Sequence, residues 1–173
     1  MPRRALVVFP ESDQLTIVED LRRRFDPLAR LIAAHVTLVF PFTSDLSTDA
    51  LRHHVERGVR GCPPFQVRLE GISEADDDYV FLDVSVGKSG FVDLHDRLYS
   101  GVLAGHLSTE HIYRPHVTVA RVADRSERAT VLTVARDVTR AVTADVRAVS
   151  AFVLHDDGRG EVEFAVPLQV DDR

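Results

Sequence analysis

The hydrophobic positions along the chain change period repeatedly, which separates strand-like from helix-like segments. Residues 5–9 form a short apolar run, as in a buried strand. In residues 47–60, by contrast, Leu51, Val55 and Val59 recur at helical spacing. The same reasoning predicts strands at 5–9, 35–40, 65–70, 79–86, 116–120, 144–154 and 161–168, and helices at 12–25, 47–60, 89–103 and 126–138.

Helices and strands alternate throughout, with two places where one strand directly follows another. The segments 144–154 and 161–168 flank the turn sequence Asp-Asp-Gly-Arg-Gly, which favours a hairpin. This order predicts an α+β fold with mostly antiparallel sheets. The length suits one domain, residues 1–173, with two lobes.

Local signals predict where several elements end and which polar side chains face solvent. Ser12 is placed to cap the first helix, and Pro41 is expected to close the strand at 35–40. Arg22–Arg24 are expected on the solvated face of the first helix, and His53 and His54 on the surface of the second.

One block of the chain is repeated in pattern. A strand, a helix and then His35-Val36-Thr37-Leu38 form the first copy, and His116-Val117-Thr118-Val119 ends the second copy of the same order. Outside these two segments the identity between the copies is weak. The repeat predicts a pseudo-two-fold arrangement in which two equivalent strands face each other across a central cleft.

The two repeated triplets carry the chemistry. Because side chains alternate along a strand, His35 and Thr37 share one face, and His116 and Thr118 do the same. A lone histidine on a strand is usually structural, but two copies at equivalent positions indicate a site. Phosphodiester hydrolysis needs a base and an acid, and imidazole suits both roles. A threonine hydroxyl beside each ring can hold the phosphate oxygens.

These residues also carry a family resemblance. The segments His-Val-Thr-Leu-Val-Phe-Pro-Phe at 35–42 and Pro-His-Val-Thr-Val-Ala-Arg at 115–121 resemble the paired signatures of the 2H phosphoesterases. The likeness is strongest to bacterial 2′-5′ RNA ligases, also described as RNA 2′,3′-cyclic phosphodiesterases. The resemblance implies a bilobal α+β fold with a central cleft, and metal-independent chemistry carried by the two histidines and their threonines. Ala34 departs from the proline often found in relatives.

Composition narrows the partners. The net charge is −6 and both halves of the chain are acidic, whereas proteins that grip long duplexes usually have a basic face. We therefore expect a small nucleotide or an RNA terminus as substrate, and no duplex DNA. Cys62 is the only cysteine, and no apolar run is long enough for a membrane span. We expect a cytoplasmic monomer that needs neither cofactor nor metal.

Four further residues are candidates for substrate binding. Arg121 matches an arginine often found after the second motif, but strict alternation from His116 places it on the opposite face unless the strand bulges. Phe9, Phe42 and Tyr113 are aromatic side chains near strand ends and could stack on a base.

A histidine metal site is an alternative interpretation. His106, His111 and His116 lie close together in sequence, but no carboxylate-rich spacing accompanies them.

The leading hypothesis is metal-independent hydrolysis of a 2′,3′-cyclic phosphate on RNA or a nucleotide. The alternatives are cleavage of 2′-5′ oligonucleotides or of an ADP-ribose cyclic phosphate by the same site, and a non-catalytic module that binds RNA ends or nucleotides. The near-symmetric repeat does not show which histidine is the acid and which the base. Ligation is not favoured, because the chain has no Gly-rich nucleotide-activating loop.

Overall fold

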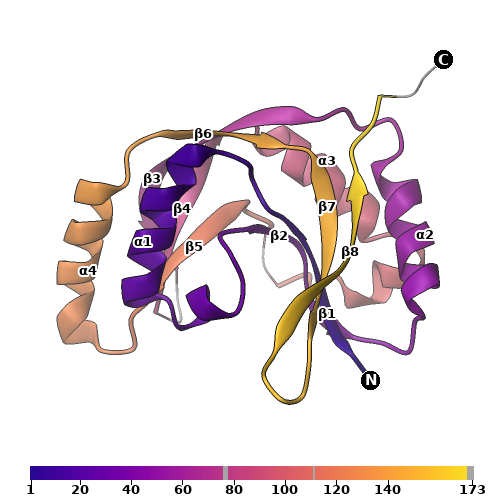
Figure 1. Cartoon of the computed structure of the whole chain (residues 1–173), viewed down its shortest axis with the longest axis horizontal. Coiled ribbons are helices and arrows are strands. Elements are labelled where there is room, and N and C mark those ends of the chain that lie inside the picture. The colour runs from indigo at the N-terminus through magenta and orange to yellow at the C-terminus, as the bar shows by residue number, and fades with distance from the viewer. Residues whose placement is uncertain (76–77, 111, 171–173) are drawn as a thin grey trace.

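The computed structural model describes residues 1–75, 78–110 and 112–170. Its strands are β1 Arg3–Val8, β2 Val36–Thr43, β3 Phe65–Glu74, β4 Tyr79–Val86, β5 His116–Arg121, β6 Val142–Val146, β7 Ala148–Leu154 and β8 Gly160–Pro167. Its α-helices are α1 Thr16–Phe25, α2 Thr48–Val59, α3 Lys88–Leu98 and α4 Arg125–Val138. Figure 1 shows α1 and α4 at one end of the molecule and α2 and α3 at the other.

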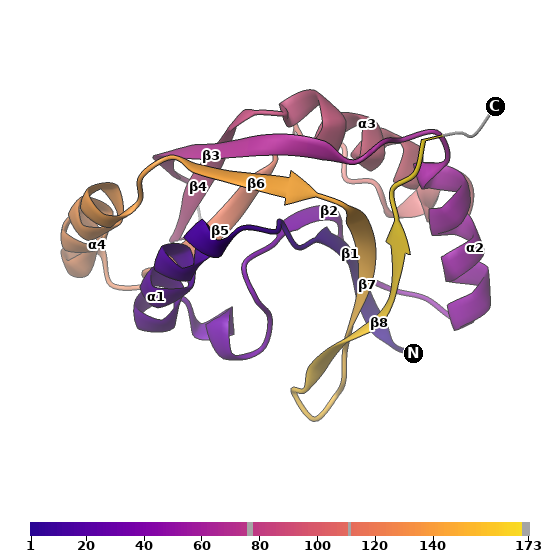
Figure 2. The ribbon, with the colours of Figure 1, turned by 45° about the horizontal axis from the view of Figure 1, so that its top comes forward.

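The eight strands form one antiparallel sheet in the order β6-β3-β4-β5-β2-β1-β7-β8. The sheet curls strongly, so that the end of β6 runs directly into β7 at the opposite side (Figure 2). The α+β class and the antiparallel pairing predicted from the sequence are therefore confirmed.

The strand order is symmetric about its centre. Reading outward from the β5–β2 pair, β4 and β1 come next, and each is the first strand of one repeated strand–helix–strand block. The two blocks are thus neighbours in the sheet and are related by a pseudo-two-fold axis. This axis passes between the two motif strands, as the sequence repeat predicts.

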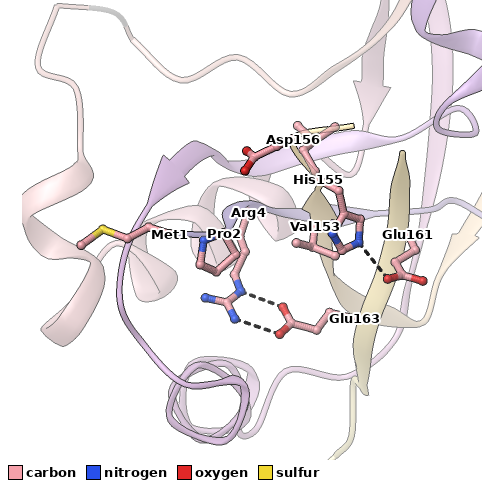
Figure 3. Close-up of a pocket in the computed structure, with 9 residues that line it drawn as sticks. Met1, Pro2, Arg4, Val153, His155, Asp156, Glu161 and Glu163 are labelled. Carbon is pink, nitrogen blue, oxygen red and sulfur yellow. Dashed lines mark hydrogen bonds and ion pairs between the residues drawn. The ribbon is translucent and has the colours of Figure 1, made fainter. Parts of the chain in front are cut away.

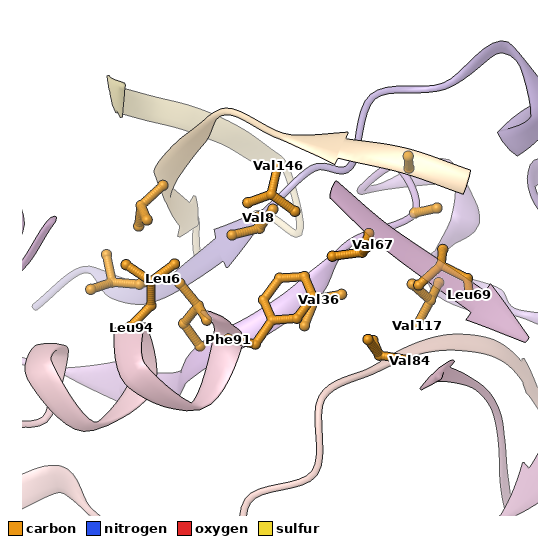
Figure 4. Close-up of a cluster of buried hydrophobic side chains, with 14 of the residues drawn as sticks. Leu6, Val8, Val36, Val67, Leu69, Val84, Phe91, Leu94, Val117 and Val146 are labelled. Atoms are coloured by element: carbon orange, nitrogen blue, oxygen red, sulfur yellow. The ribbon is translucent and has the colours of Figure 1, made fainter. Parts of the chain in front are cut away.

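The helices link the two blocks. Helix α1 packs against β5 and α3 packs against β2, so each block contributes a helix to the motif strand of the other. Their buried side chains join the strand residues Leu6, Val8, Val36 and Val117 in one hydrophobic core (Figure 4). Each motif strand therefore packs, on its buried face, against a helix of the other block.

Several element boundaries differ from the sequence prediction, among them the end of β3 at Glu74 and the start of α1 at Thr16. The segment 144–154 is two strands that meet at Arg147, because β6 pairs with β3 whereas β7 pairs with β1 and β8. Strand β2 continues through Pro41 to Thr43, and its pairing with β1 shifts register there, so the missing N–H of proline falls at an irregularity. The helix expected at 89–103 ends at Leu98 and resumes as a 3₁₀ helix at Gly101–His106.

The side chain of His54 is buried, in contrast to the surface position predicted. Its Nε2 lies 2.8 Å from the carbonyl oxygen of Leu98, which ties α2 to the end of α3. His53 is exposed, as expected. Among the described residues, no helix is long and apolar enough to cross a membrane.

Candidate active site

The two motif strands meet at one residue pair, Val36 of β2 and Val117 of β5. These two valines are equivalent in the repeat, so the pseudo-two-fold axis passes between them. Continuing the antiparallel register by one residue in each direction sets His35 opposite Thr118, and Thr37 opposite His116. The four polar side chains therefore form a compact quartet on one face of the sheet.

Burial confirms the alternation predicted for both strands. Val36, Leu38, Val117 and Val119 are completely buried against the helices, whereas the four side chains of the quartet are partly accessible. We call the face that carries the quartet the motif face.

The two imidazole rings are oriented in the same way. His35 Nδ1 lies 2.8 Å from the carbonyl oxygen of Ala33, and His116 Nδ1 lies 2.7 Å from that of Arg114. A carbonyl oxygen only accepts, so Nδ1 carries the proton and Nε2 holds the lone pair in the neutral ring. Each ring can thus take up a proton at Nε2 as a base or, once protonated, donate it as an acid.

Both histidines have a pKa below the usual value of an imidazole. Burial is the largest cause of the lowered pKa of His35, and the positive charges of Arg22 and His116 lower it further. Burial is also the main cause for His116, with a contribution from Arg114. The contribution of His116 to the lowered pKa of His35 is consistent with the two rings lying on adjacent motif strands.

The segment before His35 is anchored by Arg22, which contradicts the solvated position predicted for it. Arg22 is 1% exposed, and its guanidinium donates to Asp26 at 2.9 and 3.0 Å and to the carbonyl of Ile32 at 3.0 Å. Glu19 on the same helix accepts from the backbone N–H of Ala34. Helix α1 therefore fixes the chain just before the first motif.

His116 is held by a different set of neighbours. Its ring stacks on Phe81 with 3.6 Å between centroids, and the guanidinium carbon of Arg114 lies 5.3 Å from the centre of the Phe81 ring. Arg114 also donates to Ser73, which in turn donates to Asp83, the residue paired with His116 on β4. Stacking covers one face of the imidazole, and this is consistent with the burial that lowers its pKa.

A β-bulge brings Arg121 to the motif face. The β4–β5 register shifts between Val80 paired with Ala120 and Phe81 paired with Thr118, so Val119 is the extra residue. Val119 and Ala120 are both buried, and Arg121 is exposed with its guanidinium carbon 5.3 Å from the centre of the Tyr79 ring. The sequence analysis required a bulge for Arg121 to face the motif side, and the structure has this bulge.

The three aromatic candidates occupy different places. Phe9 lies on the motif face, with its ring tilted by 61° against that of His35 and 6.2 Å between centroids. Phe42 is buried in the helix-side core and contacts His106. Tyr113 stacks on His95, and its hydroxyl donates to the carbonyl of Thr37 at 2.9 Å. Burial raises the pKa of the Tyr113 phenol far above its usual range, which keeps it a donor. Of the three, only Phe9 has its ring close to an imidazole of the quartet, whereas Tyr113 reaches the backbone of Thr37.

The sequence reasoning missed Phe81, which stacks on His116, and Tyr79 and Arg114, which both contact Phe81. Tyr79 and Phe81 alternate with the buried Val80 and Leu82, and this period-two pattern on the strand next to β5 was the available signal.

A surface pocket near the N-terminus is separate from this site (Figure 3). It is lined by Met1, Pro2, Arg4 and residues of β7, β8 and the turn between them, and none of the quartet lines it. Arg4 is already engaged there by Glu163, with two hydrogen bonds of 2.7 and 2.9 Å. The pocket is therefore built around an internal ion pair.

The histidines before the second motif do not extend the quartet in the part of the chain that is described. His106 packs against Phe42 on the helix side, and His111 lies outside the described residues. Within the described residues, no three His, Cys, Asp or Glu side chains are grouped so as to hold a metal ion.

Comparison with known proteins finds relatives that are named as phosphoesterases. A chain from Bacillus licheniformis, assigned by name as a phosphoesterase, is 30% identical over 129 residues, covering 73% of this chain and 75% of that one. A similarly named chain from Geobacillus kaustophilus is 27% identical over 128 residues, covering 73% of each.

Solved structures share the fold. TT0787 of Thermus thermophilus superposes with a TM-score of 0.68 at 20% identity, covering 98% of this chain and 99% of that one. LigT of E. coli, complexed with 3′-AMP, gives a TM-score of 0.61 at 18% identity, covering 98% and 97%. The model of the 2′-5′ RNA ligase superfamily matches residues 9–158, which include both motifs. The chain therefore belongs to the 2′-5′ RNA ligase superfamily, whose members are 2H phosphoesterases.

Proposed function

We propose that this protein is a metal-independent phosphodiesterase that hydrolyses 2′,3′-cyclic phosphates at RNA ends or on nucleotides. The observation that carries the proposal is the quartet. Two imidazoles with the same backbone-bonded Nδ1 lie on adjacent strands, each next to its own threonine and opposite the threonine of the other strand. A phosphate held between them has a proton acceptor on one side and a proton donor on the other.

The reaction uses one neutral and one protonated ring. The neutral His Nε2 takes a proton from water as the water oxygen bonds to phosphorus, and the protonated His donates its Nε2 proton to the ribose oxygen as its bond to phosphorus breaks. The lowered pKa of each ring favours the neutral form in the free protein. A bound phosphate anion favours protonation of one of the two, which prepares the pair for acid–base catalysis.

Thr37 and Thr118 position the phosphate. Each hydroxyl can donate to a non-bridging oxygen, and the cross-strand register puts one hydroxyl beside each ring. Arg121, on the same face, supplies positive charge near Thr118.

Two further observations support a small nucleotide or an RNA terminus as the substrate. The net charge of −6 does not suit the phosphate contacts of a long duplex. The solved structures of LigT include complexes with 3′-AMP, ATP and NADP+.

The test is hydrolysis of 2′,3′-cyclic nucleotides and of a short RNA with a cyclic phosphate end, followed by chromatography in the presence of a chelator. We expect the wild type to turn over and His35→Ala and His116→Ala each to lose about 10²–10⁴-fold in kcat. His53→Ala is the matched control, because His53 is an exposed helix histidine whose ring also contacts a backbone carbonyl.

Other outcomes point to other functions. Full activity of His35→Ala or His116→Ala would overturn the two-histidine mechanism, and activity lost only in chelator would favour a metal. If only 2′-5′ oligonucleotides or only ADP-ribose cyclic phosphate were turned over, that compound would replace the 2′,3′-cyclic phosphate as the proposed substrate. Binding of nucleotides without any product over hours would indicate a non-catalytic module.

A further inference from the structure

Tyr113 connects the segment before the second motif to the strand of the first motif. It lies three residues before His116, yet its hydroxyl donates to the backbone carbonyl of Thr37 at 2.9 Å. The ladder between β2 and β5 joins the two strands at the pair Val36 and Val117. The Tyr113 hydroxyl therefore adds a side-chain link between the two halves, one residue beyond this pair.

The ring that carries this hydroxyl is held by α3. His95 is 7% exposed and stacks on Tyr113, with 3.9 Å between centroids and 14° between the ring planes. The other contacts of His95 are the Tyr99 ring, at 4.8 Å between centroids, and Asp96, at 2.9 Å from its Nδ1. Stacking in this cluster restricts the Tyr113 ring, so its hydroxyl keeps a fixed direction toward β2.

Tyr99 bonds the same strand at a second place. Its hydroxyl accepts from the backbone N–H of Phe40 at 3.0 Å. Two hydroxyls of one aromatic cluster thus bind β2, at Thr37 and three residues further along. Of these two, the hydroxyl of Tyr113 bonds to a residue of the quartet, whereas that of Tyr99 does not.

The phenol of Tyr113 is suited to hold a carbonyl. Burial raises its pKa, and the nearby Tyr99 raises it further, so the hydroxyl keeps its proton at neutral pH. A carbonyl oxygen only accepts, and the bond to Thr37 therefore requires this proton.

The equivalent position in the other block carries no hydroxyl. The residue three positions before His35 is Ile32, an aliphatic side chain buried with Ala5 and Val7. The link made by Tyr113 therefore runs in one direction, from the chain before the second motif to the strand of the first.

We propose that Tyr113 is a positioning residue for the first motif, which holds the carbonyl of Thr37 and thereby sets the place of the Thr37 hydroxyl against the phosphate. This inference rests on the proposed function, in which Thr37 and Thr118 position the phosphate. The sequence made Tyr113 a candidate for stacking on a base, and the geometry gives it this different role.

Tyr113→Phe removes the hydroxyl and keeps the stacked ring. On 2′,3′-cyclic AMP we expect kcat to fall about 10-fold with KM within about 2-fold of wild type, because a small displacement of a positioning group costs mainly rate. Tyr99→Phe is the matched control, since it removes a hydroxyl of the same cluster from the same strand, and its kcat should stay close to wild type. Unchanged kcat in Tyr113→Phe, or equal losses in both variants, would overturn the proposal.

A double-mutant cycle identifies the motif on which Tyr113 acts. If Tyr113 acts through the Thr37 hydroxyl, Tyr113→Phe should cost little more once Thr37→Val has removed that hydroxyl. In the Thr118→Val background, the same substitution should still cost about 10-fold. A full further loss in the Thr37→Val background would show a merely structural role.

NMR tests the positioning without turnover. We expect the carbonyl ¹³C resonance of Thr37 to shift in Tyr113→Phe but not in Tyr99→Phe. The change that inorganic phosphate induces at the Thr37 methyl group should be smaller in Tyr113→Phe alone. Thr37 resonances that are the same in all three proteins would overturn the inference. A wild type that shows these shifts but hydrolyses no 2′,3′-cyclic phosphate would instead count against the proposed function alone.

Discussion

His35 and His116 share the orientation of their rings and the direction of their pKa shifts, but their neighbours differ. Both rings donate from Nδ1 to the carbonyl two residues earlier, and burial lowers the pKa of both. Beyond that, His35 has the Arg22 anchor before it and the Phe9 ring beside it, whereas His116 is covered by Phe81. The repeat therefore conserves the direction of each imidazole but not the residues that enforce it.

The lowered pKa values predict the pH dependence of catalysis. The mechanism needs one ring protonated and one neutral, and this state is most populated between the two macroscopic pKa values of the pair. Both lie below the ordinary value of about 6.5, so kcat/KM for the free enzyme should peak below pH 6.5 and fall toward pH 8. The measurement is kcat/KM on 2′,3′-cyclic AMP from pH 4.5 to 9 at constant ionic strength. A rate that rises between pH 6.5 and 8 would contradict it.

Residues whose role follows from strand alternation could be predicted, and residues whose role depends on a distant partner could not. The shared face of His35 and Thr37 follows from the sequence alone. The burial of Arg22 does not, because it depends on a carbonyl ten residues further along, at Ile32. His54 likewise bonds to a carbonyl on another helix, and a local pattern carries no information on such a bond.

At the scale of elements, helix α1 holds the segment that leads into the first motif. Replacing Arg22 by alanine leaves Asp26 buried without its cation and frees the Ile32 carbonyl. We expect the free energy of unfolding to fall by about 3–5 kcal/mol, with a loss of kcat because the backbone before His35 is no longer fixed. Denaturant unfolding and kinetics on the cyclic nucleotide measure the two effects.

Arg23→Ala is the control for this prediction, since Arg23 is the adjacent residue and its ion pair with Asp20 is exposed. Its unfolding free energy should change by less than about 1 kcal/mol. If Arg22→Ala were as stable and active as Arg23→Ala, α1 would not anchor the first motif.

The types and order of the helices and strands could be predicted from periodicity. The residues at which a strand ends could not be predicted where they depend on strand pairing. Residues 144–154 form one β-rich run in sequence, yet they divide at Arg147 because the two parts join opposite ends of the sheet. The bulge at Val119 is similar. Two consecutive buried residues break the alternation there and turn Arg121 to the motif face, which the sequence left open as a condition.

At the scale of the whole molecule, the two blocks are interleaved. Each block supplies a helix to the other's motif strand, and the segment 142–167 completes both ends of the sheet. The sequence repeat predicted the pseudo-two-fold axis, but not this exchange, because contacts between the blocks leave no periodic signal. That residues 1–173 form one domain remains a prediction. The packing of each block's helix on the other block's motif strand is a physical reason to expect it.

We therefore expect the two halves to unfold together. If each motif strand needs the helix of the other block, neither half keeps a core when the other opens, and unfolding should be a single cooperative transition. Hydrogen exchange across a denaturant series would measure this, by comparing amide protection in β1 and β2 with that in β4 and β5. The same midpoint is expected for all four strands. A chain ending at residue 140 should be unfolded, since it lacks the buried Val146, Val149, Ala151 and Phe164. Separate midpoints for the two pairs of strands would show that the blocks are independent units and that the quartet forms only when they dock. A folded truncated chain would show that both blocks keep a core without β6, β7 and β8.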